Sequence, residues 1–490
     1  MPTKAVVLNP YFSDGFGIDP EVVGEYGAFN ISLVTDLPLF IDPFLIFTSE
    51  EPAYQTLHRE IVRYVTFLRD QATEREIDDG LTFAWMMFSE VKQTWLGFSA
   101  VGNRGAGLGR DFAGKLRDNL HSVFKNFGEE KISRGSHLEK LCLVREGVGR
   151  DKISDFTTNL IKRFLLEYTQ TFAKEFLTAD QRKIVNVPRV SFDYERGIWI
   201  AGKYELPWYD GDYVLLTPKD LLTRDETWIN RSDLVKRIEE IVAAVPDQQL
   251  RATLNDYFRR SLPKKPKKGD REAAASDLIR AHPEIADYYI REQEDAGDAA
   301  TSVAHDHVVA SEHKYIDQVR AFSVSLASTT TFYEVGVDTL AEARLRVGYL
   351  KHVIEDQDGY RYFYDRDEPL RREKDLQILF KLTWFGTTSD VNAEVNNGRG
   401  PVDFKVSRGR ADMSLVEFKL ASNKQLKKNL ENQVAVYEKA NDTTKSLKAI
   451  LFFTDSELAK VNRILKDLGL DADNTIILID ARPKPSGSVA

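Results

Sequence analysis

Hydrophobic and polar residues alternate strictly over two stretches near the C-terminus, residues 401–407 (PVDFKVS) and 414–420 (SLVEFKL). Because successive side chains of a β-strand point to opposite faces, alternation gives each stretch one apolar and one polar face. The intervening residues 408–413 (RGRADM) are typical of a hairpin turn. The pattern therefore predicts two paired strands whose apolar positions are Val402, Phe404, Val406, Val416, Phe418 and Leu420.

The polar faces of these strands carry the chemistry. If the apolar faces share one core, Asp403, Glu417 and Lys419 come together on the opposite side. Two carboxylates supply oxygen ligands for a divalent cation, and a lysine beside them handles a water molecule. Cation-assisted cleavage of a phosphodiester bond needs these parts. The pattern thus favours a site for Mg²⁺ or Mn²⁺.

The predicted flanking elements add polar residues to the same place. Residues 368–385 have helical periodicity, and Glu373 overhangs the site from this helix. Residues 425–440 predict a second helix, whose apolar stripe also contains Gln433 and Tyr437. A buried strand at 448–455, a helix at 456–470 and a last strand at 475–481 follow.

This order of elements resembles the PD-(D/E)XK nuclease superfamily, which has the restriction-endonuclease-like fold. The resemblance rests on Glu373, Asp403, the triplet 417–419 (EFK), and Gln433 with Tyr437. The last two match the QxxxY motif of the branch that contains the nuclease domain of the RecBCD helicase-nuclease. One departure is that Val402 separates Pro401 from Asp403, so the PD dipeptide is opened by a residue. The resemblance covers about the last 130 residues.

The resemblance implies an α/β domain with a mixed central sheet flanked by helices, and a magnesium- or manganese-dependent nuclease. It implies that Asp403, Glu417 and the Phe418 carbonyl hold the cation, with Glu373 completing the shell through water. Lys419 would orient the attacking water or stabilise charge on the phosphate. Gln433 and Tyr437 would position the substrate and Lys419. DNA is the substrate expected from the family, although these residues do not distinguish DNA from RNA.

Composition excludes fewer possible functions than the motifs do. The chain of 490 residues has a net charge of −9, yet a local positive groove is enough to bind phosphate. Cys142 is the only cysteine, which excludes an internal disulfide and a thiolate zinc site. With no long apolar run and no evident signal peptide, we expect a cytoplasmic protein without a membrane partner. The residues expected to bind nucleic acid are Arg399, Lys405, Lys424 and Lys427.

The rest of the chain predicts a modular organisation. We expect a large α+β domain of unknown role at 1–258, a basic Pro/Lys linker at 259–276, a helical spacer at 277–330 and the nuclease domain at 331–490. Residues 353–364 are interpreted as a hairpin. A large extra domain fused to such a nuclease is similar to the build of bacterial restriction and anti-phage effectors, in which it senses, binds or assembles as a homo-oligomer or with a partner subunit.

Other interpretations remain open. The charged strand faces could be a solvated sheet surface, or the fold could serve a DNA-binding or scaffold protein that does not cleave. A nucleotide-responsive switch could use the glycine-rich loop from Gly105 to Gly109, although Leu116 replaces the Ser or Thr of a phosphate-binding loop. Asp151 and Asp155 are four apart near a predicted helix start, which favours a helix cap over a second functional site.

Overall fold

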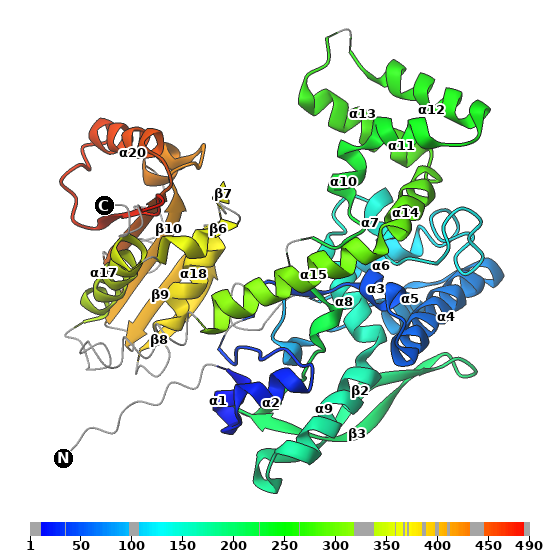
Figure 1. Cartoon of the computed structure of the whole chain (residues 1–490), viewed down its shortest axis with the longest axis horizontal. Coiled ribbons are helices and arrows are strands. Elements are labelled where there is room, and N and C mark those ends of the chain that lie inside the picture. Colours follow the sequence, from blue (N-terminus) through cyan, green and yellow to red (C-terminus); the bar gives the residue numbers. More distant parts are fainter. Residues whose placement is uncertain are drawn as a thin grey trace.

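The computed structural model has two lobes, which we call the N-terminal region (residues 11–317) and the C-terminal domain (residues 338–484) (Figure 1). It describes residues 11–34, 36–97, 107–224, 226–263, 265–317, 338–357, 359–365, 368–369, 372–384, 389–396, 401–408, 412–431 and 445–484. Among these residues, no helix combines the length and apolar character needed to cross a bilayer.

The N-terminal region is built mainly of helices around a large apolar core. The helix α4 (Pro52–Glu74) illustrates why: Leu57, Ile61 and Leu68 recur at helical spacing and are buried. Its other elements up to residue 224 are α1 (Phe12–Phe16), α2 (Pro20–Glu25), β1 (Leu39–Ile41), α3 (Pro43–Thr48), α5 (Asp79–Met86), α6 (Arg110–Arg117), α7 (Lys140–Val144), α8 (Arg150–Leu160), α9 (Lys162–Phe176), β2 (Arg182–Asp193), β3 (Ile198–Tyr209), β4 (Asp212–Tyr213) and β5 (Leu222–Arg224), with short 3₁₀ turns between some of them.

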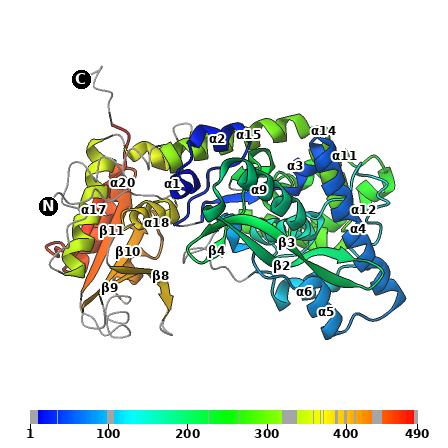
Figure 2. The ribbon, with the colours of Figure 1, turned by 90° about the horizontal axis from the view of Figure 1, so that it is seen from below.

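Strands β2 and β3 form a long antiparallel hairpin along one side of this region (Figure 2). The hairpin reverses after the Asp193–Ile198 pair, and Gly197 supplies the left-handed backbone of its turn with φ of 63°. Its apolar side packs on α9, and Phe192 and Trp199 reach the rings of Tyr64 and Phe88. The ribbon is therefore anchored by aromatic contacts to the core.

The segment after residue 230 is helical and belongs to the N-terminal region. It contains α10 (Arg231–Lys236), α11 (Ile238–Ala244), α12 (Gln248–Ser261), α13 (Lys268–Ala281), α14 (Ile285–Asp295) and α15 (Gly297–Glu312). The second half of the stretch predicted as a linker is thus helix α13, which packs against α12 and buries Ala275 and Leu278. Residues 273–275 are alanines, which have a high helix propensity, and the helix therefore forms despite the basic, proline-containing sequence before them. Helices α14 and α15 pack on α7 and α3, so the predicted spacer is docked.

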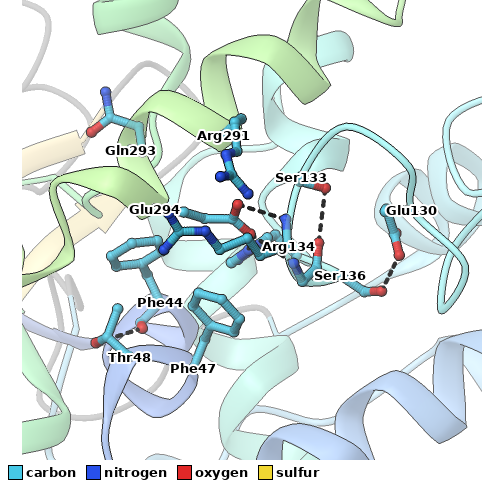
Figure 3. Close-up of polar contacts among 12 residues, drawn as sticks. Phe44, Phe47, Thr48, Glu130, Ser133, Arg134, Ser136, Arg291, Gln293 and Glu294 are labelled. Atoms are coloured by element: carbon cyan, nitrogen blue, oxygen red, sulfur yellow. Dashed lines mark hydrogen bonds and ion pairs between the residues drawn. The ribbon is translucent and has the colours of Figure 1, made fainter.

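Buried polar contacts hold α14 in place (Figure 3). Glu294 accepts hydrogen bonds from the backbone N–H groups of Arg134 (2.6 Å) and Gly135 (2.7 Å). His137 Nε2 lies 2.9 Å from Glu294 Oε1, with both side chains buried. This cluster, Arg134 to His137 with Glu294, ties α14 to the segment before α7.

The C-terminal domain has a five-stranded mixed sheet in the order β12-β11-β10-β9-β8. Its strands are β8 (Asp390–Asn396), β9 (Pro401–Arg408), β10 (Asp412–Leu420), β11 (Ser446–Phe452) and β12 (Ile476–Asp480). Strands β8, β9 and β10 are antiparallel neighbours, whereas β10, β11 and β12 run parallel. Helices α17 (Thr339–Asp356), α18 (Glu373–Leu382) and α20 (Asp455–Asp467) flank the sheet. An α/β domain with a mixed sheet between helices is thus confirmed.

The two faces of the sheet are covered by different helices. On one face Phe404, Val416 and Phe418 pack against Phe380 of α18, with ring centroids 5.1 Å (Phe404) and 5.0 Å (Phe418) from it. On the other face Ile450 packs in a separate cluster with Val461 and other residues of α20. The alternation in β9 and β10 sorts the described side chains as predicted. Val402 lies on β9, and its side chain is outside the described set.

Two details upstream of α18 differ from the sequence interpretation. The predicted hairpin at 353–364 is wrong, because α17 continues to Asp356 with Val353 and Ile354 buried on its core side, and a 3₁₀ turn (Gly359–Phe363) follows. The predicted helix start at residue 368 is also wrong. Glu368–Pro369 forms the short strand β7, paired with β6 (Tyr364–Asp365), and α18 begins only at Glu373.

Candidate active site

Strands β9 and β10 bring the predicted carboxylates together at one end of their ladder. The antiparallel pairs run from Asp412–Arg408 to Val416–Phe404, and Asp403 lies just beyond the last pair, beside the 417–419 triplet. There the Asp403 carboxylate accepts the backbone N–H of Phe418 at 2.6 Å. Polar side chains therefore gather where the two strands separate.

Lys419 occupies the centre of this group. Its Nζ lies 3.5 Å from Asp403 Oδ2, 3.8 Å from Glu373 Oε2 and 3.0 Å from the Phe418 carbonyl oxygen. Burial opposes the charge of this ammonium, but Asp403, Glu373 and Glu417 together outweigh burial and raise the pKa of Lys419. Lys419 is thus held protonated, with its charge directed at the carboxylates.

Glu417 is the most buried carboxylate of the group, with 8% of its surface exposed. Burial raises the pKa of Glu417 to about 7, and the negative charges of Asp403 and Glu373 act in the same direction. Lys419 and Lys448 partly offset this effect. A carboxylate whose ionisation is disfavoured by burial and by like charges is a recognised mark of a functional site.

Glu373 reaches the site from the first turn of α18. Its Oε1 accepts the backbone N–H of Leu420 at 3.2 Å, which fixes the start of the helix over the end of β10. Glu373 and Lys419 are 46 positions apart in the sequence, so only the packing of α18 on the sheet brings them together. The structure thus places Glu373 and Asp403 in ion-pair contact with Lys419, and Glu417 near enough for the charges of all three to act on its pKa.

The remaining predicted residues fall elsewhere. Gln433, Tyr437 and Arg399 lie outside the described residues, although 426–431 are helical as expected. Lys405 is half-buried on β9. Lys424 lies just before the helical segment and Lys427 within it, and both are exposed. Lys427 pairs with Asp467 of α20 at 3.1 Å.

Sequence reasoning missed one residue of the site, Lys448. In the parallel register of β10 and β11, Glu417 is the partner of Lys448, which is 5% exposed. Its charge lowers the pKa of the Glu417 carboxyl. The signal was present, since Lys448 lies in a mostly apolar strand at a position that shares a face with Ile450.

The donor types, although not their positions, match the chemistry of a hard divalent cation. Asp403, Glu417 and Glu373 supply carboxylate oxygens, the ligands that Mg²⁺ prefers. A bound cation would relieve the repulsion that Asp403 and Glu373 exert on the charge of Glu417. Within the described part of the chain, no three His, Cys, Asp or Glu side chains already converge as a metal site. In this structure the Lys419 ammonium, close to Glu373 and Asp403, supplies positive charge to these carboxylates.

Comparisons with known proteins identify two families over separate parts of the chain, each described only as a domain of unknown function. DUF8370 matches residues 17–230, and DUF8371 matches residues 339–455. The second match contains Glu373, Asp403, Glu417 and Lys419 within one family unit. No curated protein and no solved structure matches the chain. Helices α10 to α15 lie between the two matched segments.

Proposed function

We propose that this protein is a divalent-metal-dependent nuclease that cleaves phosphodiester bonds in DNA, with a C-terminal domain of the restriction-endonuclease-like fold. The observation that carries the proposal is the ion-pair contact of Lys419 with Asp403 and Glu373, beside the buried Glu417, at the separated ends of β9 and β10. The mixed sheet with flanking helices and the position of Glu373 on the preceding helix also agree with that family.

Each residue has a role that follows from its position. Asp403 and Glu417, with the Phe418 carbonyl, would hold Mg²⁺ or Mn²⁺, and Glu373 would act on it through water. The bound cation would polarise the phosphate and lower the pKa of a water molecule. Lys419, already protonated and desolvated, would orient the attacking water or stabilise the charge that develops on the phosphate. Gln433 and Tyr437 would contact the substrate backbone.

A second function is favoured by one observation. The Lys419 ammonium contacts the Phe418 carbonyl and lies near Asp403, so two of the groups proposed to hold the cation are engaged with it. A protein that keeps this ion-paired arrangement would bind nucleic acid without cleaving it. As a nuclease, the protein would fit the build of a restriction or anti-phage effector, with the N-terminal region as sensor.

Cleavage of supercoiled plasmid tests the proposal. Wild-type protein with Mg²⁺ or Mn²⁺ should cut, and EDTA should stop it. Asp403→Ala should abolish cleavage and Lys419→Ala should reduce it by about a hundredfold or more. Lys445→Ala is the matched control, because Lys445 also lies between two carboxylates, Asp412 (2.9 Å) and Asp338 (3.4 Å), but at the opposite end of β10. Plasmid that is bound but never cut would support the non-cleaving alternative.

A further inference from the structure

Helix α18 lies between the catalytic sheet and the N-terminal region (Figure 1). Its sheet side carries Phe380, in contact with Phe404 and Phe418. Its other side carries Lys381, where burial lowers the pKa and Asp36 of the N-terminal region opposes that effect. A movement of the N-terminal region would therefore act on the helix that carries Glu373.

A buried contact between the two lobes is made by Asp375, which lies two residues after Glu373 in the first turn of α18. Lys314 Nζ lies 2.9 Å from Asp375 Oδ2, and the Tyr315 hydroxyl donates to Asp375 Oδ1 at 3.0 Å. The Lys314 and Asp375 side chains are only 9% and 3% exposed. The Tyr315 carbonyl in turn accepts a hydrogen bond from the Tyr11 hydroxyl. Both carboxylate oxygens of Asp375 are thus held by the N-terminal region.

The backbone that supplies these donors has an unusual form. Helix α15 ends at Glu312 and continues as a π-helical turn over His313–Asp317. Such turns are rare and often occur at functional positions, because they rotate side chains out of the α-helical order. Here the turn directs the adjacent Lys314 and Tyr315 at the same carboxylate. His313, by contrast, has a side chain that is 67% exposed.

The energetics make this contact a two-state element. A buried ion pair with all its partners in place is tolerated, whereas removal of one partner leaves an uncompensated buried charge. The contact is therefore either made in full or separated with its groups solvated. Since α18 is a hydrogen-bonded rod, release of Asp375 would shift Glu373, whose Oε1 accepts the Leu420 N–H.

We propose that Asp375, held by Lys314 and Tyr315, is a positioning residue through which the N-terminal region controls the nuclease site. This inference rests on the proposed function for its catalytic consequence. The contact keeps the first turn of α18, and with it Glu373, over the end of β10. A signal received by the N-terminal region acts on cleavage by making or releasing this contact.

The test compares three variants of the full chain. Tyr315→Phe removes one hydroxyl and keeps the ring. Lys314→Met/Asp375→Leu replaces both charges of the ion pair with apolar groups, and His313→Ala is the control from the same turn. We measure hydrogen exchange of the 415–420 segment, which contains the Leu420 amide, and the Mg²⁺ concentration that gives half-maximal cleavage.

We expect the double variant to fold, to exchange the Leu420 amide at least about tenfold faster, and to need several-fold more Mg²⁺. Tyr315→Phe should show a smaller change in the same direction, and His313→Ala none. Unchanged exchange at Leu420 in the folded double variant would overturn the inference. Because hydrogen exchange does not depend on activity, a wild-type protein that fails to cleave would reject the proposed function and still leave this contact tested.

Discussion

Two nearly buried carboxylates, Glu294 in the N-terminal region and Glu417 in the C-terminal domain, have opposite surroundings. Glu294 takes backbone N–H groups from Arg134 and Gly135 and lies beside His137. Glu417, also buried, faces the negative charges of Asp403 and Glu373 as well as the ammonium of Lys419. The first is surrounded by donors that fit its two oxygens (Figure 3). The second is surrounded by charges of both signs.

This difference separates a structural carboxylate from a chemical one. Donors that fully match a buried group fix one conformation and leave nothing for a ligand to improve. When burial and like charges raise the pKa of a carboxylate to near neutrality, a bound cation stabilises its charged form. The comparison predicts that Glu294 matters for stability and that Glu417 matters for binding and pH response.

The largest effect should follow from breaking the Glu294 network. Glu294→Ala leaves two partly buried N–H groups and the buried His137 without their acceptor, so we expect the free energy of unfolding to fall by about 3 kcal/mol. Glu292→Ala is the control on the same helix, because the Glu292 pair with Arg237 is partly exposed and should contribute less than about 1 kcal/mol. Urea unfolding measures both. If Glu294→Ala lost cleavage with unchanged stability, Glu294 would have a role in cleavage and not in stability.

The next effect is a pH dependence that comes from Glu417. Its folded pKa of about 7 lies above the ordinary value of 4.5, so the folded state binds the extra proton between these values. The protonated group therefore adds stability that is fully present below about pH 4.5 and is lost as pH rises through 7, on the order of 3 kcal/mol.

Chemical unfolding at pH 5 and pH 8 checks this sign. The loss of stability between the two values should be smaller in Glu417→Gln than in wild type, and the effects of other buried acids cancel in that difference. Mg²⁺ should restore wild-type stability at pH 8 and leave Glu417→Gln unchanged. Equal pH responses of the two proteins would show that Glu417 titrates normally.

The sequence was sufficient to predict which residues of the site share a strand face. It was insufficient to predict the contacts of the site with elements far away in the sequence. Alternation placed Asp403 opposite Phe404, and placed Glu417 and Lys419 opposite Phe418, because period-two patterning acts within one strand. The contacts of Asp375 were not predictable, since its partners lie 61 and 60 residues earlier, on a π-helical turn that periodicity does not reveal. The docked helix α13 was mistaken for a linker because local composition does not report tertiary packing.

A smaller effect concerns Gln433, which would distinguish a working site from an ion-paired sheet edge. If its amide contacts a charged group of the site, Gln433→Ala loses about 1.5 to 3 kcal/mol of transition-state stabilisation, or roughly tenfold to a hundredfold in cleavage. The melting temperature of the Gln433→Ala variant should change little. Glu431→Ala, at an exposed position just before it, should cleave normally. Normal cleavage by Gln433→Ala, or loss only through unfolding, would assign the helix to the core alone.

The smallest effect on stability, and the sharpest test of the exposed basic residues, comes from Lys427. Its ion pair with Asp467 is half exposed on both sides, so Lys427→Ala should change the free energy of unfolding by less than about 0.5 kcal/mol. If Lys427 binds a phosphate, the same variant should weaken DNA binding and reduce the slope of log affinity against log salt by about 1. Asp467→Ala breaks the same ion pair but keeps the lysine charge, so its DNA affinity should hold or rise. Equal salt slopes in wild type, Lys427→Ala and Asp467→Ala would place the DNA path away from α20 and leave this ion pair a surface contact, unlike the carboxylate cluster around Lys419.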